Sequence, residues 1–249
     1  MTTKTNQPQT EGTSALALTP EQQVAMFVAH EAEISREGFG FIPGRVKAEK
    51  SCLFVDDLGE PSKELRGVAV FKQRTRGYWP KGVGKKDKVP SCTSEGMLNE
   101  GIDREGSKHD CASCPLNAWG SGTNEAGEPT RGKACKEMRR MFLVRTDEAL
   151  PIMISFAPSS IKNYDTYWSG RCRKKINDVD REVVVTLSSQ AGSEFDYAVA
   201  EFKLGDEVPV EQRISFARMR EMIRAAAEKI GITADDYEST PDAETESVY

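Results

Sequence analysis

Several short segments of the chain alternate between apolar and polar residues with the two-residue period of a β-strand. The alternation is clear at 67–74 and predicts a half-buried strand there. The segments 182–188 and 195–203 are also strand-like, and the small residues between them, 191–193, favour a hairpin. The same reasoning predicts further strands at 51–55, 141–145 and 152–156.

Three other segments carry the signals of helices. Thr19 is followed three residues later by Gln22, a pair that is typical of a helix N-terminus, so we expect a helix over about 19–36. Hydroxyl residues that can satisfy free backbone N–H groups open a second predicted helix over 158–175. Apolar residues at near-helical spacing predict a third helix over about 209–230.

The order of these elements predicts a mainly β fold with helical additions, in the α+β class. Five or six short strands with few intervening helices are typical of an antiparallel barrel or sandwich. A helix between the third and fourth strands is the arrangement of an OB-like barrel. A five-stranded OB-like barrel is therefore the predicted architecture.

The length of 249 residues and a hydrophobic content of 38% allow one sizeable domain, because domains commonly contain about 100–200 residues. Residues 1–18 are predicted to be a disordered arm and 19–233 a single domain. Within it, 81–136 is poor in apolar residues and rich in Gly, Lys, Ser and Asp. It is therefore predicted to be an insertion that needs a stabilising cross-link to be ordered. No apolar run reaches the ~18 residues of a membrane span and no signal peptide can be recognised, so a cytoplasmic protein is expected.

The net charge of −5 is unevenly distributed along the chain. Six acidic residues and no Lys or Arg lie between 235 and 249, so the rest of the chain is close to neutral and contains basic segments. We predict that 234–249 is an acidic, disordered tail of the kind that often acts as an interaction arm. The alternative is that this tail serves solubility alone.

Four cysteines lie in the insertion, and two of them form a CxxC pair. Thiolates at this spacing on a tight turn can bind one ion, and Zn²⁺ accepts four sulfur ligands in tetrahedral geometry. Metal binding would also supply folding free energy that so polar a segment lacks. A structural Zn²⁺ is therefore predicted on Cys92, Cys111, Cys114 and Cys135.

Other interpretations of the cysteines stay open. His109, two residues before Cys111, is a substitute ligand, and free thiols or disulfides are further alternatives. A catalytic CxxC redox pair fits poorly, because the surrounding segment is predicted to be loop. Cys52 lies in a predicted strand and is expected to be a core thiol, whereas Cys172 has no evident role.

The sequence offers little material for catalysis. A site of four cysteines is closed and leaves no position for a catalytic water. The chain has two histidines and neither a P-loop nor a GxSxG motif. A non-enzymatic protein is predicted, and a nuclease built from scattered carboxylates is the alternative.

Basic and aromatic residues are interleaved in two segments. At 71–81 the cations would share one face of a strand, where they can neutralise phosphates while rings stack on unpaired bases for about 1–3 kcal/mol per base. At 164–175 aromatic and basic residues have the spacing of one helix face. The predicted nucleic-acid contacts are Lys72, Arg74, Arg76, Tyr78, Trp79, Lys81, Lys85, Lys86, Tyr167, Arg171, Arg173 and Lys174.

A structural interpretation competes with the binding one at the helix. An aromatic stripe at helical spacing is more often core than ligand platform, and we favour the core for Tyr164 and Trp168. The strand cations favour the binding interpretation, because Lys72, Arg74 and Arg76 cannot be buried on one face without partners.

Several motifs resemble those of a group of bacteriophage-encoded proteins. They are PSCTSEG at 90–96, CASCPLNAWGS at 111–121, GKACK at 132–136, and the Leu-Pro and Pro-Ser-Ser stretches at 150–151 and 158–160. The layout as a whole resembles phage single-stranded-DNA-binding proteins. These combine an OB barrel with, in some members, a zinc-bearing insertion and an acidic tail that ends in an aromatic residue, as Tyr249 does here.

The resemblance implies a role for the tail: it would recruit replication or recombination enzymes and compete with DNA for the basic groove. The tail of this chain is less dense in Asp and Glu than the tails of such proteins. The leading hypothesis is a phage-type protein that binds single-stranded DNA without strong sequence preference and acts in DNA replication, recombination or repair. The alternative is a phage regulator that binds a host protein, such as RNA polymerase or a defence nuclease, through its zinc module and acidic arm.

Overall fold

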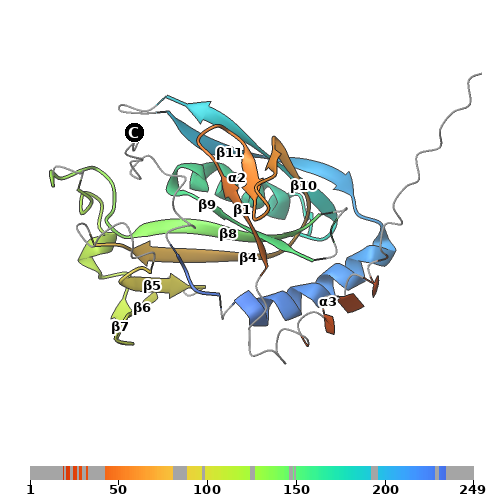
Figure 1. Ribbon diagram of the computed structural model, residues 1–249, viewed down its shortest axis with the longest axis horizontal. Helices are drawn as coiled ribbons and strands as arrows, with labels where there is room; N and C mark the ends of the chain where they lie inside the picture. The colour runs from red at the N-terminus through yellow and green to blue at the C-terminus, as the bar shows by residue number, and fades with distance from the viewer. Residues whose placement is uncertain are drawn as a thin grey trace, which may run out of the picture.

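The computed structural model describes residues 43–80, 89–96, 99–123, 127–145, 148, 150–191, 196–227 and 230–233, together with eight positions between 19 and 32. In this part the chain forms a mixed β-sheet with helices packed against it (Figure 1). The predicted arm at 1–18, the predicted tail at 234–249, and Lys81, Lys85 and Lys86 lie outside the described residues.

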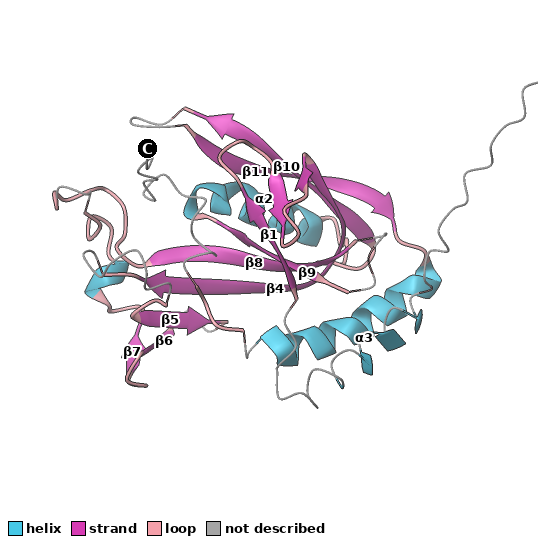
Figure 2. Cartoon of the chain, in the orientation of Figure 1, coloured by secondary structure: helices cyan, strands magenta, loops and turns pink. Residues whose placement is uncertain are grey.

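Strands make up most of the described elements (Figure 2). The strands are β1 (Gly44–Ala48), β2 (Phe54–Asp56), β3 (Pro61–Ser62), β4 (Glu64–Tyr78), β5 (Cys92–Glu95), β6 (Glu100–Asp103), β7 (Lys108–Asp110), β8 (Lys136–Val144), β9 (Ile152–Phe156), β10 (Arg181–Gln190) and β11 (Tyr197–Glu207). The helices are α2 (Ile161–Arg173) and α3 (Val210–Ala227), with short 3-10 turns η1 (Pro115–Asn117) and η2 (Pro158–Ser160).

The described strands form one sheet in the order β3-β2-β1-β9-β8-β4-β5-β6-β7, and β10 pairs with both β4 and β11. The pairs are antiparallel apart from β1 with β9, which is parallel. In the described residues β9 and β11 do not pair, so the sheet is not closed. The predicted α+β class is confirmed.

The long strand β4 joins the two parts of the sheet. Its first residues pair with β10, and from Val68 onward it pairs with β8. Gly67 stands where the partner changes, and a side chain there would collide with the backbone carbonyl of Val144. This glycine therefore lets β8 approach β4 at the point where β10 takes over.

Two apolar cores lie on opposite faces of the β4–β8 pair. One contains Val68, Val70 and Phe142 and is covered by α3 through Phe216 and Met219. The other is covered by α2 and by the β10–β11 hairpin, and includes Ala69, Met141, Tyr164, Trp168 and Val185. Alternate residues of β4 and β8 thus enter different cores, as the pleat of a strand requires.

A β-bulge in β4 decides which core each side chain meets. The register with β8 shifts between Ala69 and Phe71, so Val70 is the extra residue. Val68 and Val70 pack under α3, but Lys72, which the two-residue period would place beside them, lies over Trp168 of α2. A bulge of this kind re-aims the side chains that follow it.

The capping pair predicted at Thr19 is formed. Gln22 N donates to Thr19 Oγ1 at 3.3 Å, and Thr19 N donates to Gln22 Oε1 at 2.7 Å. The helix predicted at 158–175 is also present, as η2 followed by α2. The Ser160 side chain does not cap it, because Ser160 Oγ accepts instead from the backbone N–H of Ala200 at 2.9 Å.

The predicted strand at 51–55 is corrected by the structure. The strand begins only at Phe54, and Cys52 lies in the turn between β1 and β2 with a φ of 60°. Cys52 is half-buried rather than a core thiol. The local pattern of apolar residues was misleading because the turn that precedes β2 carries no Gly or Pro.

Candidate nucleic-acid interface

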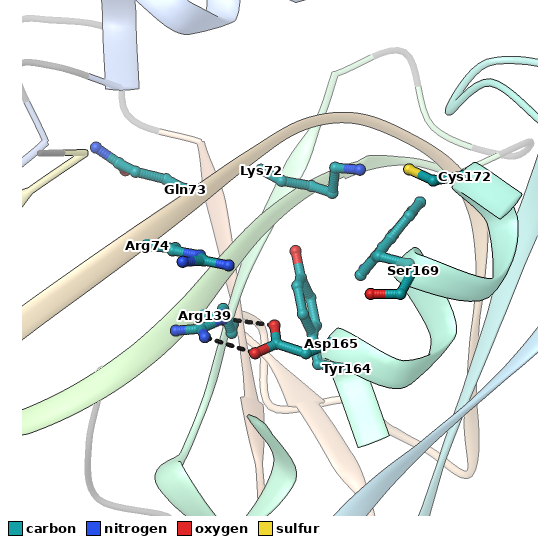
Figure 3. Close-up of a pocket in the computed structure, with 9 residues that line it drawn as sticks. Lys72, Gln73, Arg74, Arg139, Tyr164, Asp165, Ser169 and Cys172 are labelled. Carbon is teal, nitrogen blue, oxygen red and sulfur yellow. Dashed lines mark hydrogen bonds and ion pairs between the residues drawn. The ribbon is translucent and has the colours of Figure 1, made fainter. Parts of the chain in front are cut away.

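The basic half of β4 faces a cavity between β4, β8 and α2 (Figure 3). This α2 cavity has a volume of about 610 Å³. It is lined by Lys72, Gln73, Arg74, Arg139, Tyr164, Asp165, Trp168, Ser169 and Cys172. Cations from the sheet therefore meet aromatic rings from the helix.

Lys72 crosses from β4 toward α2. Its Nζ lies 2.7 Å from Asp178 Oδ1 and 3.6 Å from the centre of the Trp168 ring. Burial lowers the pKa of Lys72, and the Asp178 carboxylate opposes that effect. The charge of Lys72 is therefore partly neutralised within the protein.

Two further cations are paired with carboxylates. Arg139 donates to Asp165 through Nε at 3.0 Å and Nη2 at 2.8 Å, and to Glu137 at 2.7 Å. Arg76 donates to Glu137 at 3.2 Å. The hydrogen bonds from Arg139 lower the pKa of Asp165, so this carboxylate stays ionised and holds Arg139 in place.

Arg74 differs from its neighbours on the strand. It stands directly opposite Arg139 in the β4–β8 ladder and is exposed to solvent. No carboxylate within the described ranges forms an ion pair with it. Because like charges directly opposite each other are unfavourable, Arg74 is the residue of this face best placed to bind an anion.

Tyr164 and Trp168 of α2 belong to the core, as the structural interpretation expected, and Tyr167, which was predicted to contact nucleic acid, is half-buried and packs against the same core. Tyr164 and Trp168 are 4% and 7% exposed and pack in the core beneath α2. Tyr167 stacks on Phe202 with ring centroids 5.7 Å apart. These rings support the wall of the α2 cavity rather than project into solvent.

The predicted cations of α2 divide into two groups. Arg171 is 2% exposed and donates to the backbone carbonyls of Asn177, Asp178 and Arg181, so it is not accessible to a nucleic acid. It fixes the loop that follows the helix. Arg173 and Lys174, by contrast, are exposed at the end of α2.

Tyr78 and Trp79 lie where β4 ends, next to the insertion. Both are half-buried. The Trp79 ring folds back over Gly77, where any side chain would collide with it. Tyr78 pairs with Cys92, so the basic strand runs directly into the region of the cysteines.

The structure gathers the four predicted zinc ligands around this end of the sheet. One opens β5, two flank the turn after β7, and one directly precedes β8. Backbone hydrogen bonds fix two of them: Cys111 N donates to Asn99 O at 2.9 Å and Cys135 N to Leu116 O at 2.8 Å. We call this set the cysteine cluster: Cys92, Cys111, Cys114 and Cys135.

Gly101 on β6 leaves the space that the sulfur atoms occupy. A Cβ at this position would lie 3.0 Å from Cys92 Sγ and 3.2 Å from Cys111 Sγ. Two thiols from separate segments thus face the same small volume. A side chain there would push them apart.

The thiols also interact electrostatically. Burial raises the pKa of Cys135 to about 12; Arg76 opposes this rise, and Cys111, Cys92 and Cys114 add to it. Within the described residues, no group of three or more His, Cys, Asp or Glu side chains is arranged to hold a metal ion as it stands.

His109, the alternative ligand, is engaged elsewhere. Its Nε2 lies 2.7 Å from Asp103 Oδ2. That contact lowers the pKa of Asp103. The imidazole therefore has a carboxylate partner within the insertion.

Sequence reasoning missed an exposed ring near the cysteine cluster. Trp119 is 80% exposed, and Lys133 Nζ lies 5.1 Å from the centre of its ring. The signal for it was present, because Trp119 lies five residues after the CxxC turn and is flanked by small residues, Ala118 and Gly120, rather than by a hydrophobic run. Arg139 was missed as well, since its role depends on the register between β4 and β8.

Comparison with protein-family models, curated proteins and solved structures finds no match to this chain. Over the described residues, no helix has the length and apolar character needed to cross a bilayer.

Proposed function

We propose that this protein binds single-stranded DNA of any sequence and acts, as phage proteins of this type do, in DNA replication, recombination or repair without catalysing a reaction. The observation that carries the proposal is that Arg74 is exposed and forms no ion pair with a described residue, whereas the neighbouring cations Lys72 and Arg76 are held by carboxylates. Arg173 and Lys174 are two further exposed cations, at the end of α2. Such a surface suits a polyanion.

The strand connectivity supports an OB-like scaffold for this function. Five strands are paired in the order β9-β8-β4-β10-β11, and α2 lies between β9 and β10 in the chain. In OB folds the connections between the first two and last two strands border the nucleic-acid site. Here the first of these connections would be the segment between β4 and β8, which contains the cysteine cluster.

The cysteine cluster would hold a structural Zn²⁺. The donor set fits, because four thiolates are the preferred ligands of a closed zinc site. The space over Gly101, which a Cβ would fill, brings two of the sulfurs together. When bound, zinc would supply folding free energy to the polar insertion and fix the end of β4 that carries Tyr78.

Trp119 would add a stacking platform beside this surface. Aromatic rings bind unpaired bases through their faces, and a neighbouring cation strengthens the contact. Trp119→Ala should weaken binding to a short oligo-dT by about 1–3 kcal/mol. Leu58→Ala, which removes a similarly exposed apolar side chain from the β2–β3 turn, is the control. Equal affinities for the two variants would remove Trp119 from the interface.

The central test is the salt dependence of oligo-dT binding. Cations that neutralise phosphates release counterions, so affinity should fall steeply between about 50 and 200 mM salt. Duplex DNA should bind more weakly, because its bases are not available for stacking. A flat salt response, or tighter binding to duplex, contradicts the proposal.

A second candidate function is supported by a different surface. Val210 and Ile214 lie one turn apart on α3 and are exposed, although both are large and apolar. Apolar side chains on an outer helix face are a feature of protein-binding surfaces. On this alternative the chain is a regulator that binds a host protein through this face of α3, and the predicted acidic tail is a further contact. It predicts one dominant partner in a pull-down and no binding to isolated oligo-dT.

A further inference from the structure

Three buried side chains that line the α2 cavity have a polar atom without a hydrogen-bond partner among the described residues. Tyr164 is 4% exposed, yet its hydroxyl has none among the described residues, and the same is true of Nε1 of Trp168, which is 7% exposed. The third atom is Oε1 of Gln73, an acceptor, which Figure 3 shows directed away from the space that Tyr164 enters; all three residues line the cavity. A buried polar group without a partner is unfavourable, so these positions point to a ligand that completes them.

The Tyr164 hydroxyl is aimed into the cavity. Figure 3 shows it rising from α2 into the space between Arg74 and Ser169, with Arg74 directed toward the same space. The Asp165 carboxylate beside it is turned away toward Arg139, and both of its oxygens are used there. The acceptor next to Tyr164 is therefore already occupied.

The unpartnered donors at the cavity are suited to an anion. A tyrosine hydroxyl and an indole N–H can donate, and a guanidinium can donate twice to an oxyanion in a planar, bidentate arrangement. The other charges at the cavity have partners, since Lys72 pairs with Asp178 and Arg139 with Asp165. Among the described residues, the charge of Arg74 is not neutralised by a carboxylate, so the cavity has an unpaired positive charge there.

Lys72 bridges two walls of the cavity. Lys72 reaches from β4 across to the α2 side, where it contacts the Trp168 ring and Asp178. The volume of about 610 Å³ lies in the range of small-molecule sites. A ligand of the size of a single nucleotide therefore fits the cavity.

We propose that the α2 cavity binds a single terminal phosphate group, held by Arg74 and by the hydroxyl of Tyr164, with the attached nucleoside against Trp168 and the stem of Lys72. The phosphate comes from the end of a DNA strand or from a free nucleotide. In the first case the inference rests on the proposed function, and the cavity gives the protein a preference for phosphorylated strand ends.

The test compares ligands that differ only in the terminal phosphate. Oligo-dT with a phosphate at the 5′ end, at the 3′ end, or at neither end is titrated into the full-length protein, and dTMP and inorganic phosphate are titrated separately. We expect one phosphorylated end to bind about tenfold more tightly than the hydroxyl end, which corresponds to about 1.4 kcal/mol. Free dTMP should compete with the phosphorylated end for the cavity and so remove this tenfold difference in affinity.

Tyr164→Phe is the decisive variant. It removes only the hydroxyl and keeps the ring in the core, so the protein should remain as stable as the wild type. It should lose most of the preference for the phosphorylated end, as should Arg74→Gln. Tyr197→Phe on β11 is the matched control for the hydroxyl, and Arg218→Gln on the outside of α3 is the matched control for the charge.

The outcomes separate this inference from the proposed function. If oligo-dT binds equally well with every end and dTMP does not bind, the phosphate pocket is contradicted while single-strand binding stands. If dTMP binds in a Tyr164-dependent manner but oligo-dT does not bind, the pocket stands and the proposed function fails. Retention of the end preference in Tyr164→Phe contradicts the pocket.

Discussion

The even-numbered residues of β4 face different sides of the sheet before and after the bulge. Val68 and the bulged residue Val70 pack under α3 in an apolar core. After the bulge, Lys72 and Arg74 face α2 and an open, charged cavity. A single extra residue at Val70 therefore allows one strand to be part of the scaffold and part of the candidate binding surface.

Neighbouring arginines on β8 show the same contrast. Arg140 is buried on the α3 side and donates to the backbone carbonyls of Ile230 and Gly231 at 3.0 and 3.2 Å. Arg139 is held by carboxylates on the α2 side. On the α3 side a cation anchors the chain after the last helix, whereas on the α2 side cations and anions are arranged around a cavity.

The largest expected effect comes from the cysteine cluster, which borders the basic half of β4. Cys135→Ser should release zinc and unfold the insertion, with a loss in free energy of unfolding of more than about 4 kcal/mol. Zinc content of the purified protein and hydrogen exchange of residues 89–135 measure both effects. Cys172→Ser, on the exposed side of α2, should change neither. A wild-type protein without zinc would contradict this part of the account.

The next largest effect should separate stability from binding. Met219→Ala opens a hole under α3, where Met219 is fully buried, and should lower the free energy of unfolding by about 2–5 kcal/mol. Affinity for oligo-dT, measured well below the melting temperature, should not change. A loss of affinity in the folded variant would mean that the α3 side contributes to binding.

Arg74→Gln should show the reverse behaviour. Its free energy of unfolding should stay within about 0.5 kcal/mol of the wild type, because Arg74 is exposed. Binding to oligo-dT should weaken for all sequences alike, and the slope of log affinity against log salt should fall by about 1. Arg218→Gln on α3 controls for the loss of one charge, and identical salt slopes for the two variants would remove Arg74 from the interface.

The smallest effect concerns the carboxylate that holds Arg139. Because the folded state lowers the pKa of Asp165, its contribution to stability is present above the pKa of the unfolded chain and is lost as the pH falls through the lower, folded value. Denaturant melts from pH 6 down to about pH 3 should therefore show a slightly weaker acid destabilisation in Asp165→Asn than in the wild type. Asp206→Asn, whose carboxylate pairs with Arg66 at the surface, is the control. An unchanged acid limb in Asp165→Asn would mean that this pair adds nothing to stability.

Local pattern was enough to predict much of the fold. The strand at 152–156, the β10–β11 hairpin, both described helices and the Thr19–Gln22 cap all depend on residues close together in the sequence. The core role of Tyr164 also followed from its helical spacing. The alternation of Lys72 and Arg74 placed both residues on one face of β4.

Features that depend on distant residues could not be predicted in this way. No local signal marks Val70 as a bulge, because its side chain is a good strand former in either register. The partners of the basic residues come from β8, α2 and the loop after α2, so their ion pairs appear only once the chain is folded. For the same reason the sequence did not indicate that Arg171 donates its hydrogen bonds to backbone carbonyls and is buried.

The most direct test of the central claim is a hydrogen-exchange map of the full-length protein with and without oligo-dT at low salt. The account predicts slower exchange in the second half of β4, at the end of α2 and around Trp119, and no change in α3. Protection confined to α3, or no protection anywhere at saturating oligo-dT, would contradict it.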